Sequence, residues 1–121
     1  MDIRTNSDIR DNNIRRIVSA LFREGAMTKQ ALAAKLNLSM PTITLLLKDL
    51  KNIGVIKNGE QLESTGGRKP TTIMPVYDFK YSVGIEVTLY EIRIVVIDMG
   101  LNIIAKESYA IPLERSVEYW K

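Results

Sequence analysis

A stripe of apolar residues with helical spacing begins just after Asn13. Its members recur at i, i+3, i+4, i+7 and i+8, the pattern of an amphipathic helix with one buried face: Ile14, Ile17, Val18, Leu21 and Phe22. Gly25 follows and predicts the C-terminal end of this helix. The residues before the stripe, Met1 to Asp11, are polar and predict a loose arm.

Two further helices follow at the spacing of a helix-turn-helix. Thr28 predicts the cap of a short helix that ends at Leu36, and Ser39 predicts the cap of a longer helix that ends before Gly54. Pro41 falls in the first turn of the longer helix, where its missing N–H group is tolerated. The predicted buried stripe of that helix is Ile43, Leu46, Leu47, Leu50 and Ile53. A short helix, a tight turn and a longer capped helix are typical of a helix-turn-helix.

A β-hairpin is predicted after the third helix. Val55 to Lys57 predicts a strand, Asn58-Gly59 a turn and Thr71 to Val76 the returning strand. The stretch from Ser64 to Pro70 is too rich in glycine, proline and charge to be core, so it predicts the tip of the hairpin. Three helices and a hairpin predict a winged helix-turn-helix domain over residues 1–78.

Beyond Asp78 the pattern changes to β-branched, alternating segments. Tyr81 to Val87, Glu91 to Met99 and Asn102 to Pro112 predict three consecutive antiparallel strands, and Glu114 to Lys121 predicts the opening of a helix. The predicted fold class is therefore α+β. A three-helix winged helix-turn-helix domain is followed by a three-stranded antiparallel meander, which opens a second domain over residues 79–121.

Composition narrows the chemistry of such a chain. Its 121 residues include no cysteine and no histidine, which excludes disulfides, thiolate nucleophiles, imidazole bases and Cys/His metal sites. We therefore expect no catalytic residue, no metal and no cofactor. The N-terminus lacks an apolar signal segment, and no apolar run approaches the roughly 18 residues of a membrane span. A cytoplasmic protein without a membrane partner is expected.

The net charge of +3 is unevenly distributed. Up to Lys80 there are 13 basic and 8 acidic side chains, whereas from Tyr81 onward there are 4 basic and 6 acidic ones. A basic N-terminal part favours a polyanionic partner such as double-stranded DNA, although a bias of this size is also common on surfaces that bind nothing.

The exposed face of the third predicted helix carries candidate DNA contacts. In a helix-turn-helix the second helix of the pair enters the major groove with its N-terminal residues toward the base edges. The candidates are Ser39, Met40, Pro41, Thr42, Thr44, Leu45 and Lys48. Thr42 and Thr44 each offer a hydroxyl and a methyl group to base edges, whereas Lys48 lies further along and suits a phosphate. The alternative is a face that is merely solvated.

Two other groups are candidate backbone or minor-groove contacts. Thr28, Lys29 and Gln30 open the second helix, where free N–H groups and the helix dipole favour a phosphate; ordinary capping by Thr28 is an equally good explanation. Arg68 and Lys69, set between Gly66-Gly67 and Pro70, predict a basic finger that enters an A·T-rich minor groove. A solvated interdomain linker is the alternative for this segment.

With these motifs the chain resembles the ROK family, which joins sugar kinases to sugar-responsive repressors. The resemblance lies in Ser39 to Thr44, in Ser64-Thr65-Gly66-Gly67-Arg68-Lys69-Pro70, the most specific of the three, and in Val83 to Val87. It favours a DNA contact for Arg68 and Lys69. It also implies that the meander is the start of a truncated sugar-binding domain with an actin-like, ribonuclease-H-like fold. In the kinases of the family an acidic residue precedes a glycine-rich phosphate turn; here Glu86 keeps the acid, but Val87-Thr88-Leu89-Tyr90 lacks the glycines.

The predicted function is sequence-specific regulation of transcription through a double-stranded DNA operator. The resemblance implies a repressor of carbohydrate-metabolism genes, whose sugar or sugar-phosphate effector would bind only in a longer parent protein. Two alternatives remain open: a ROK-type sugar kinase with an appended winged helix, and a winged helix that docks another protein.

The meander also predicts that the chain is incomplete as a functional unit. Its apolar side chains are too many for a solvated three-stranded sheet: Ile85, Val87, Ile92, Ile94, Val95, Val96, Ile97, Ile103 and Ile104. Either the winged domain or a second copy of the chain must cover them. A dimer is favoured, because a two-fold axis would also place two recognition helices on the half-sites of a palindromic operator.

Overall fold

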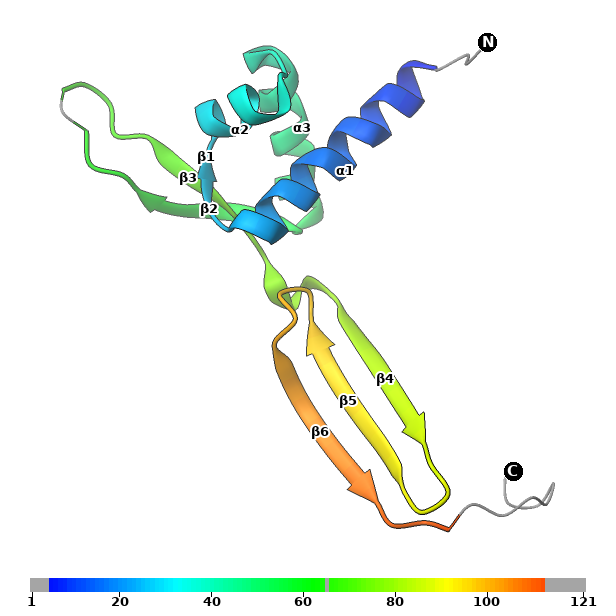
Figure 1. Ribbon diagram of the computed structural model, residues 1–121. Coiled ribbons are helices and arrows are strands. Elements are labelled where there is room, and N and C mark those ends of the chain that lie inside the picture. The colour runs from blue at the N-terminus through cyan, green and yellow to red at the C-terminus, as the bar shows by residue number, and fades with distance from the viewer. Residues whose placement is uncertain (1–4, 65, 113–121) are drawn as a thin grey trace. The chain divides into compact units, whose positions relative to one another are not determined.

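The computed structural model describes residues 5–64 and 66–112. The chain divides into two compact units between Tyr77 and Asp78, and each unit has its own sheet (Figure 1). The predicted helix from Glu114 to Lys121 lies outside the described residues. No helix within the described ranges is both long and apolar enough to cross a membrane.

The first unit packs three helices against a small antiparallel sheet. The helices are α1 (Asn6–Glu24), α2 (Lys29–Leu36) and α3 (Met40–Ile53). The strands, in the order β1-β3-β2, are β1 (Met27–Thr28), β2 (Ile56–Gln61) and β3 (Thr71–Pro75). The core between them consists of apolar side chains that are 3% exposed or less: Ile17, Leu21, Leu32, Ile43, Leu46, Leu47, Leu50, Ile56 and Ile73. The predicted winged helix-turn-helix is confirmed, and β1 is a strand that the sequence pattern did not reveal.

α1 begins at Asn6, so the prediction of a loose arm up to Asp11 is wrong for the residues described. Thr5 and Asp8 form a reciprocal capping box. The Asp8 amide donates to Thr5 Oγ1 at 3.2 Å, and the Thr5 amide donates to Asp8 Oδ2 at 2.9 Å. Two N–H groups that would otherwise be free are thereby satisfied, which extends the helix through a polar sequence. The hydrogen bond from the Thr5 side chain also lowers the pKa of Asp8.

α3 follows its prediction except at its last residue. Ser39 caps it, Pro41 lies in its first turn, and Gly54 ends it in the left-handed conformation with φ of 95°. Ile53, predicted to be buried, is 63% exposed. At 3.6 residues per turn Ile53 lies about 80° around the helix from Ile43, at the margin of the buried stripe.

The wing hairpin is longer than its prediction. β2 continues through Asn58-Gly59, the predicted turn; Asn58 pairs with Ile73, and a bulge precedes the pairing of Gln61 with Thr71. A Cβ atom at residue 59 would lie 2.5 Å from Thr72 Oγ1, so the glycine permits close strand approach instead of a turn. The loop at the tip is closed by a hydrogen bond of 2.8 Å from the Leu62 amide to the Pro70 carbonyl. β2 and β3 extend away from the three helices (Figure 1).

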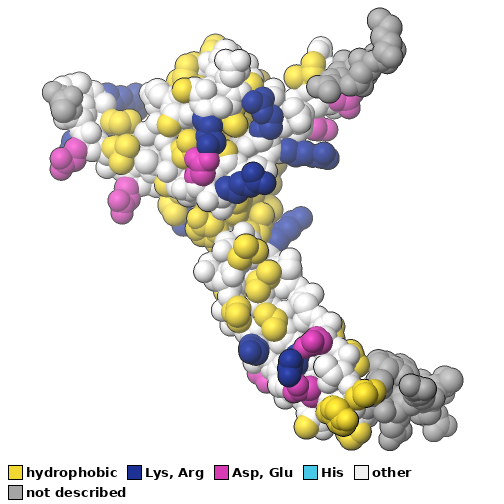
Figure 2. Space-filling view, in the orientation of Figure 1, with side chains coloured by type: hydrophobic (Ala, Val, Ile, Leu, Met, Phe, Trp, Pro, Cys, Tyr) yellow, Lys and Arg dark blue, Asp and Glu magenta, His cyan; other side chains and the backbone are white. Residues whose placement is uncertain are grey.

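The second unit is the predicted meander. A short 3₁₀ turn, η1 (Tyr77–Phe79), leads into β4 (Tyr81–Val87), β5 (Ile92–Asp98) and β6 (Ile103–Tyr109), which pair in chain order. The register opposes Val83 to Val96 and Ile85 to Ile94, so apolar side chains share one face. The side of the sheet seen in Figure 2 carries hydrophobic side chains together with Lys, Arg, Asp and Glu side chains.

Candidate nucleic-acid interface

Local hydrogen bonds fix the turn between α2 and α3. The Ala31 amide donates to Thr28 Oγ1 at 3.1 Å at the start of α2. At its end Asn37 adopts φ of 53°, which lets the Leu38 amide donate to the Ala33 carbonyl at 3.0 Å. Arg16 of α1 donates to the Leu36 carbonyl. These bonds set the angle at which α3 leaves the turn.

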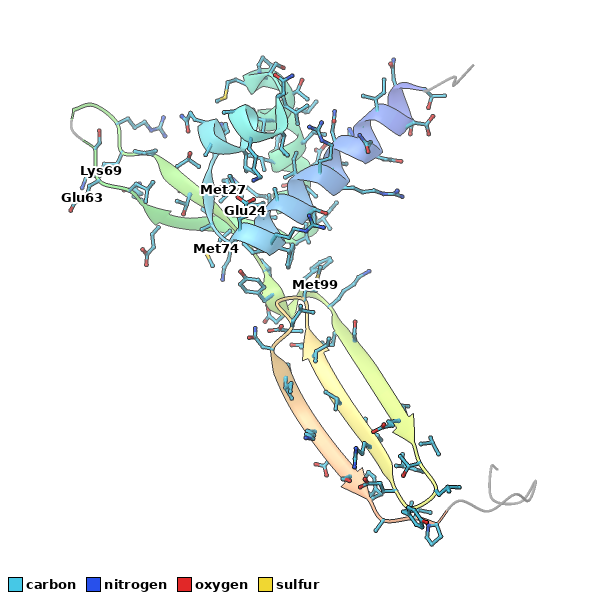
Figure 3. The ribbon with its side chains drawn as sticks, viewed as in Figure 1. Glu24, Met27, Glu63, Lys69, Met74 and Met99 are labelled. Carbon is cyan, nitrogen blue, oxygen red and sulfur yellow. The ribbon has the colours of Figure 1, made fainter. Side chains whose placement is uncertain are left out.

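A hollow of about 400 Å³ lies between the start of α2, the end of α3 and the wing. Its lining is cationic and amide-bearing around a buried isoleucine: Lys29, Gln30, Lys51, Asn58, Arg68, Lys69, Pro70, Thr71 and Ile73. No acidic side chain belongs to this lining. Glu63 and Lys69 are labelled on the wing loop in Figure 3.

A second hollow, of about 230 Å³, continues along α3. It shares Lys29 and Lys51 with the first, and its lining residues are Lys29, Thr44, Leu47, Lys48, Lys51 and Asn52. We call the two hollows together the basic groove. Its five cations are Lys29, Lys48, Lys51, Arg68 and Lys69.

Among the residues described in the winged unit, no ion pair neutralises a groove cation. The ion pairs of the described winged unit join Arg10 to Asp49 and Lys35 to Glu24, and neither involves a groove cation. Like charges that converge without counter-charges create a positive potential, which attracts a polyanion. The basic groove can therefore hold phosphate groups that lie beside α3.

The structure brings six of the predicted contact residues into the groove. Lys29, Gln30, Arg68 and Lys69 line its first hollow, and Thr44 and Lys48 line its second.

The other predicted contact residues lie outside the groove. Met40, Pro41 and Leu45 are exposed on α3 but line neither hollow. Thr28 serves as the cap of α2 and pairs with Thr72 in the sheet. Ser39 Oγ donates to Thr42 Oγ1 at 2.8 Å, which engages both side chains in the cap of α3.

Sequence reasoning missed Lys51, Asn52 and Asn58. Lys51 follows Thr44 by seven residues and Lys48 by three, so helical periodicity alone could have placed it on the same face. Asn52 follows Lys48 by four residues and could have been predicted from helical periodicity in the same way. Asn58 carried no such signal, because Asn58-Gly59 has the composition of a hairpin turn.

The turn after Glu86 in the second unit is self-contained. The amides of Tyr90 and Glu91 donate to Thr88 Oγ1 at 3.3 and 3.1 Å, and the Thr88 amide donates to the Glu91 carbonyl at 2.9 Å. These N–H groups are therefore already satisfied by the chain. In residues 5–64 and 66–112, no three His, Cys, Asp or Glu side chains gather closely enough to hold a metal ion.

Residues 10–57 match the family of winged helix-turn-helix DNA-binding domains. The chain is also 25% identical over 88 residues to the DNA-binding transcriptional dual regulator NagC of Escherichia coli K12 and to the N-acetylglucosamine repressor of Shigella flexneri. Each match covers 73% of this chain and 22% of the relative, so the chain spans about a fifth of the length of these relatives.

A solved structure has the same fold. It is a ROK-family transcriptional regulator described as a homologue of the Escherichia coli MLC protein, with a TM-score of 0.64 and 15% sequence identity, and the match covers 85% of this chain and 26% of that one. Residues 10–57 of this chain are therefore similar to winged helix-turn-helix DNA-binding domains, and the resemblance to ROK-family transcriptional regulators is confirmed.

Proposed function

We propose that this ROK-type chain binds a double-stranded operator with sequence specificity and represses transcription. The observation that carries the proposal is the basic groove, in which five cations from α2, α3 and the wing converge without an acidic neighbour in the lining. Most protein–DNA affinity comes from such phosphate contacts, whereas specificity comes from the base edges that α3 reaches.

In this proposal each part of the winged unit contacts a different part of the duplex. The N-terminal half of α3 lies in the major groove, with Thr44 toward the bases. Lys29 and Lys51, shared by both hollows, bind the phosphates of the adjacent strand. Arg68 and Lys69 reach the neighbouring minor groove, where Arg is favoured by a narrow A·T-rich geometry.

Salt-dependent titration of a fluorescent duplex tests the proposal. The expected affinity falls linearly with salt on logarithmic axes, with a slope of about −0.9 per phosphate contacted. Lys29→Ala combined with Lys51→Ala should weaken binding to all sequences and reduce the slope by about 2. Lys106→Ala, which removes an exposed lysine of β6, is the matched control and should change neither. An affinity that does not respond to salt would instead favour a winged helix that docks another protein.

The relatives support a proposal for the regulated genes and the effector. The relative from Shigella flexneri is named an N-acetylglucosamine repressor, which supports a role in carbohydrate metabolism with a sugar or sugar-phosphate effector. The effector would be bound by a longer parent protein, in which β4 to β6 open the sugar-binding domain. A regulator that binds the genome acts in the cytoplasm.

A kinase function is not part of the proposal. A phosphate turn needs free backbone N–H groups and close backbone approach, whereas here Thr88 Oγ1 already accepts from the Tyr90 and Glu91 amides. The side chains of Leu89 and Tyr90 also stand where glycines would give access. A phosphate-transfer assay on a parent protein that contains this chain tests the point; the expected result is no turnover.

We further propose that the functional form is a homodimer. The apolar face of the β4-β5-β6 sheet includes Val83 and Ile85, which are 60% and 65% exposed. A second copy that buries this face would satisfy its hydrophobic side chains and supply a second recognition helix for a palindromic operator. Sedimentation equilibrium should give a dimer at micromolar concentration, and Ile85→Lys should shift it to monomer; a wild-type monomer throughout would contradict the proposal.

A further inference from the structure

In its first two turns, where a recognition helix contacts DNA, α3 exposes apolar side chains. Pro41, Thr44, Leu45 and Lys48 share an arc of about 100° around the helix, opposite to the buried stripe. Leu45 is 56% exposed and Met40 is 40% exposed, although both lie in the first two turns. Exposed apolar side chains of this size on the leading turns of a recognition helix call for a partner with apolar groups.

The same segment lacks the side chains that read purines. From Met40 to Leu47 the sequence contains no Arg, Lys, Asn, Gln, Asp or Glu. Bidentate recognition uses Arg or Lys for guanine and Asn or Gln for adenine, and acidic side chains accept from cytosine. The nearest such group, Lys48, lines the basic groove. The leading turns of α3 therefore offer hydroxyl and hydrocarbon groups only.

Of the two threonines in this segment, Thr44 is the more exposed to solvent. Thr42 is half-buried and accepts a hydrogen bond from Ser39 Oγ at 2.8 Å within the helix cap. Thr44 is exposed and lines the second hollow beside Lys48. Thr44 lies about 100° around the helix from Leu45, within the same outward arc, and its side chain also carries a methyl group.

We infer that α3 recognises thymine methyl groups in the major groove, through Leu45 and the methyl group of Thr44. The C5-methyl of thymine is the apolar group that the major-groove edges of unmodified bases present, and it is bound by aliphatic side chains. Specificity at these positions then comes from burial of methyl groups instead of bidentate hydrogen bonds. This inference rests on the proposed function and names the base that the recognition helix reads.

Deoxyuridine substitution tests the inference with the full chain. A preferred duplex is first selected from a randomised pool, and its thymines are then replaced one at a time by deoxyuridine, which removes the methyl group and keeps the O4 acceptor and the base pair. At one or two positions the affinity should fall about fourfold, the equivalent of one buried methylene group.

Two variants assign the effect to the helix. Leu45→Ala should abolish the thymine preference at one of these positions, because the truncated side chain no longer reaches the methyl group. Ile53→Ala is the matched control: it truncates a similarly exposed apolar residue at the far end of α3, so the preference should remain.

The outcomes separate the inference from the proposed function. Salt-dependent binding that is insensitive to deoxyuridine at every position overturns the inference and leaves the proposed function standing. A deoxyuridine effect that is equal in wild type and Leu45→Ala at every position also overturns it, because Leu45 then recognises no methyl group. Failure to bind any duplex overturns both.

Discussion

The two units of the chain place their apolar side chains differently. In the winged unit Leu47 and Ile17 are 2% and 0% exposed, whereas in the meander Ile85 is 65% exposed. Both units have regular, well-paired secondary structure, so hydrogen bonding alone does not distinguish them. The winged unit is therefore stabilised by its own core, whereas the sheet of the second unit has an apolar face that no other element among residues 78–112 covers.

Truncation of one apolar residue in each unit should have the largest effect and should differ most between the two units. Leu47→Ala removes a buried side chain from the winged core and should lower the free energy of unfolding of that unit by about 2–5 kcal/mol. At concentrations low enough to keep the chain monomeric, Ile85→Ala, on the sheet face that is exposed in the single chain, should cost about 1 kcal/mol or less, through strand propensity. Urea denaturation followed by circular dichroism measures both. Equal losses under these conditions would mean that the sheet face is covered within the monomer.

Two glycine substitutions should also affect the stability of the two units differently, with a smaller loss than Leu47→Ala. Gly59→Ala would place a Cβ atom 2.5 Å from Thr72 Oγ1, a hydroxyl that donates to the Glu60 carbonyl at 2.9 Å. The clash should destabilise the winged unit by about 1–3 kcal/mol. Gly84→Ala in β4 would meet only the Val95 carbonyl, at 4.0 Å, and should be nearly neutral. Thermal unfolding of the two variants checks the order; a larger loss for Gly84→Ala would contradict it.

The smallest expected effect concerns pH, and here the two units behave alike. Hydrogen bonds from the Thr5 side chain lower the pKa of Asp8, and those from the Asn102 side chain lower the pKa of Asp98. A lowered folded-state pKa means that each group stabilises its unit above the ordinary aspartate pKa of about 3.9. This contribution is lost as the pH falls through the lowered value.

Carboxyl chemical shifts followed through an acid titration measure both pKa values. Asp8→Asn should remove the acid dependence at the start of α1 and leave that of the Asp98 turn unchanged. A folded-state pKa at or above the ordinary value for either group would contradict the hydrogen-bond assignment.

Most of the fold was predictable because periodic patterns and caps are local signals. The stripes of α1 and α3, the caps at Thr28 and Ser39 and the alternation of β4 to β6 all appear in the structure. The features of the fold that the sequence pattern did not predict depend on non-local or reciprocal contacts. The start of α1 rests on the Thr5–Asp8 capping box, and the path of β2 through Gly59 rests on its fit against Thr72.

The candidate site was predictable in its helical part and less so elsewhere. Lys29, Thr44 and Lys48 followed from the position of each residue within α2 or α3. The convergence of Lys51 and Asn58 with the wing depends on how α3 packs beside the hairpin, which no local pattern encodes. The engagement of Thr42 in the helix cap likewise became visible only from its hydrogen bond with Ser39.

Amide chemical-shift mapping of the labelled chain against a selected duplex tests the central claim most directly. On DNA addition, chemical shifts should change in the winged unit, around Lys29, Thr44, Lys51 and Arg68, while the amide shifts of β4 to β6 should stay in place. Changes confined to the β4-β5-β6 sheet, or no changes at low salt, would contradict the claim that the basic groove and α3 form a DNA-binding surface.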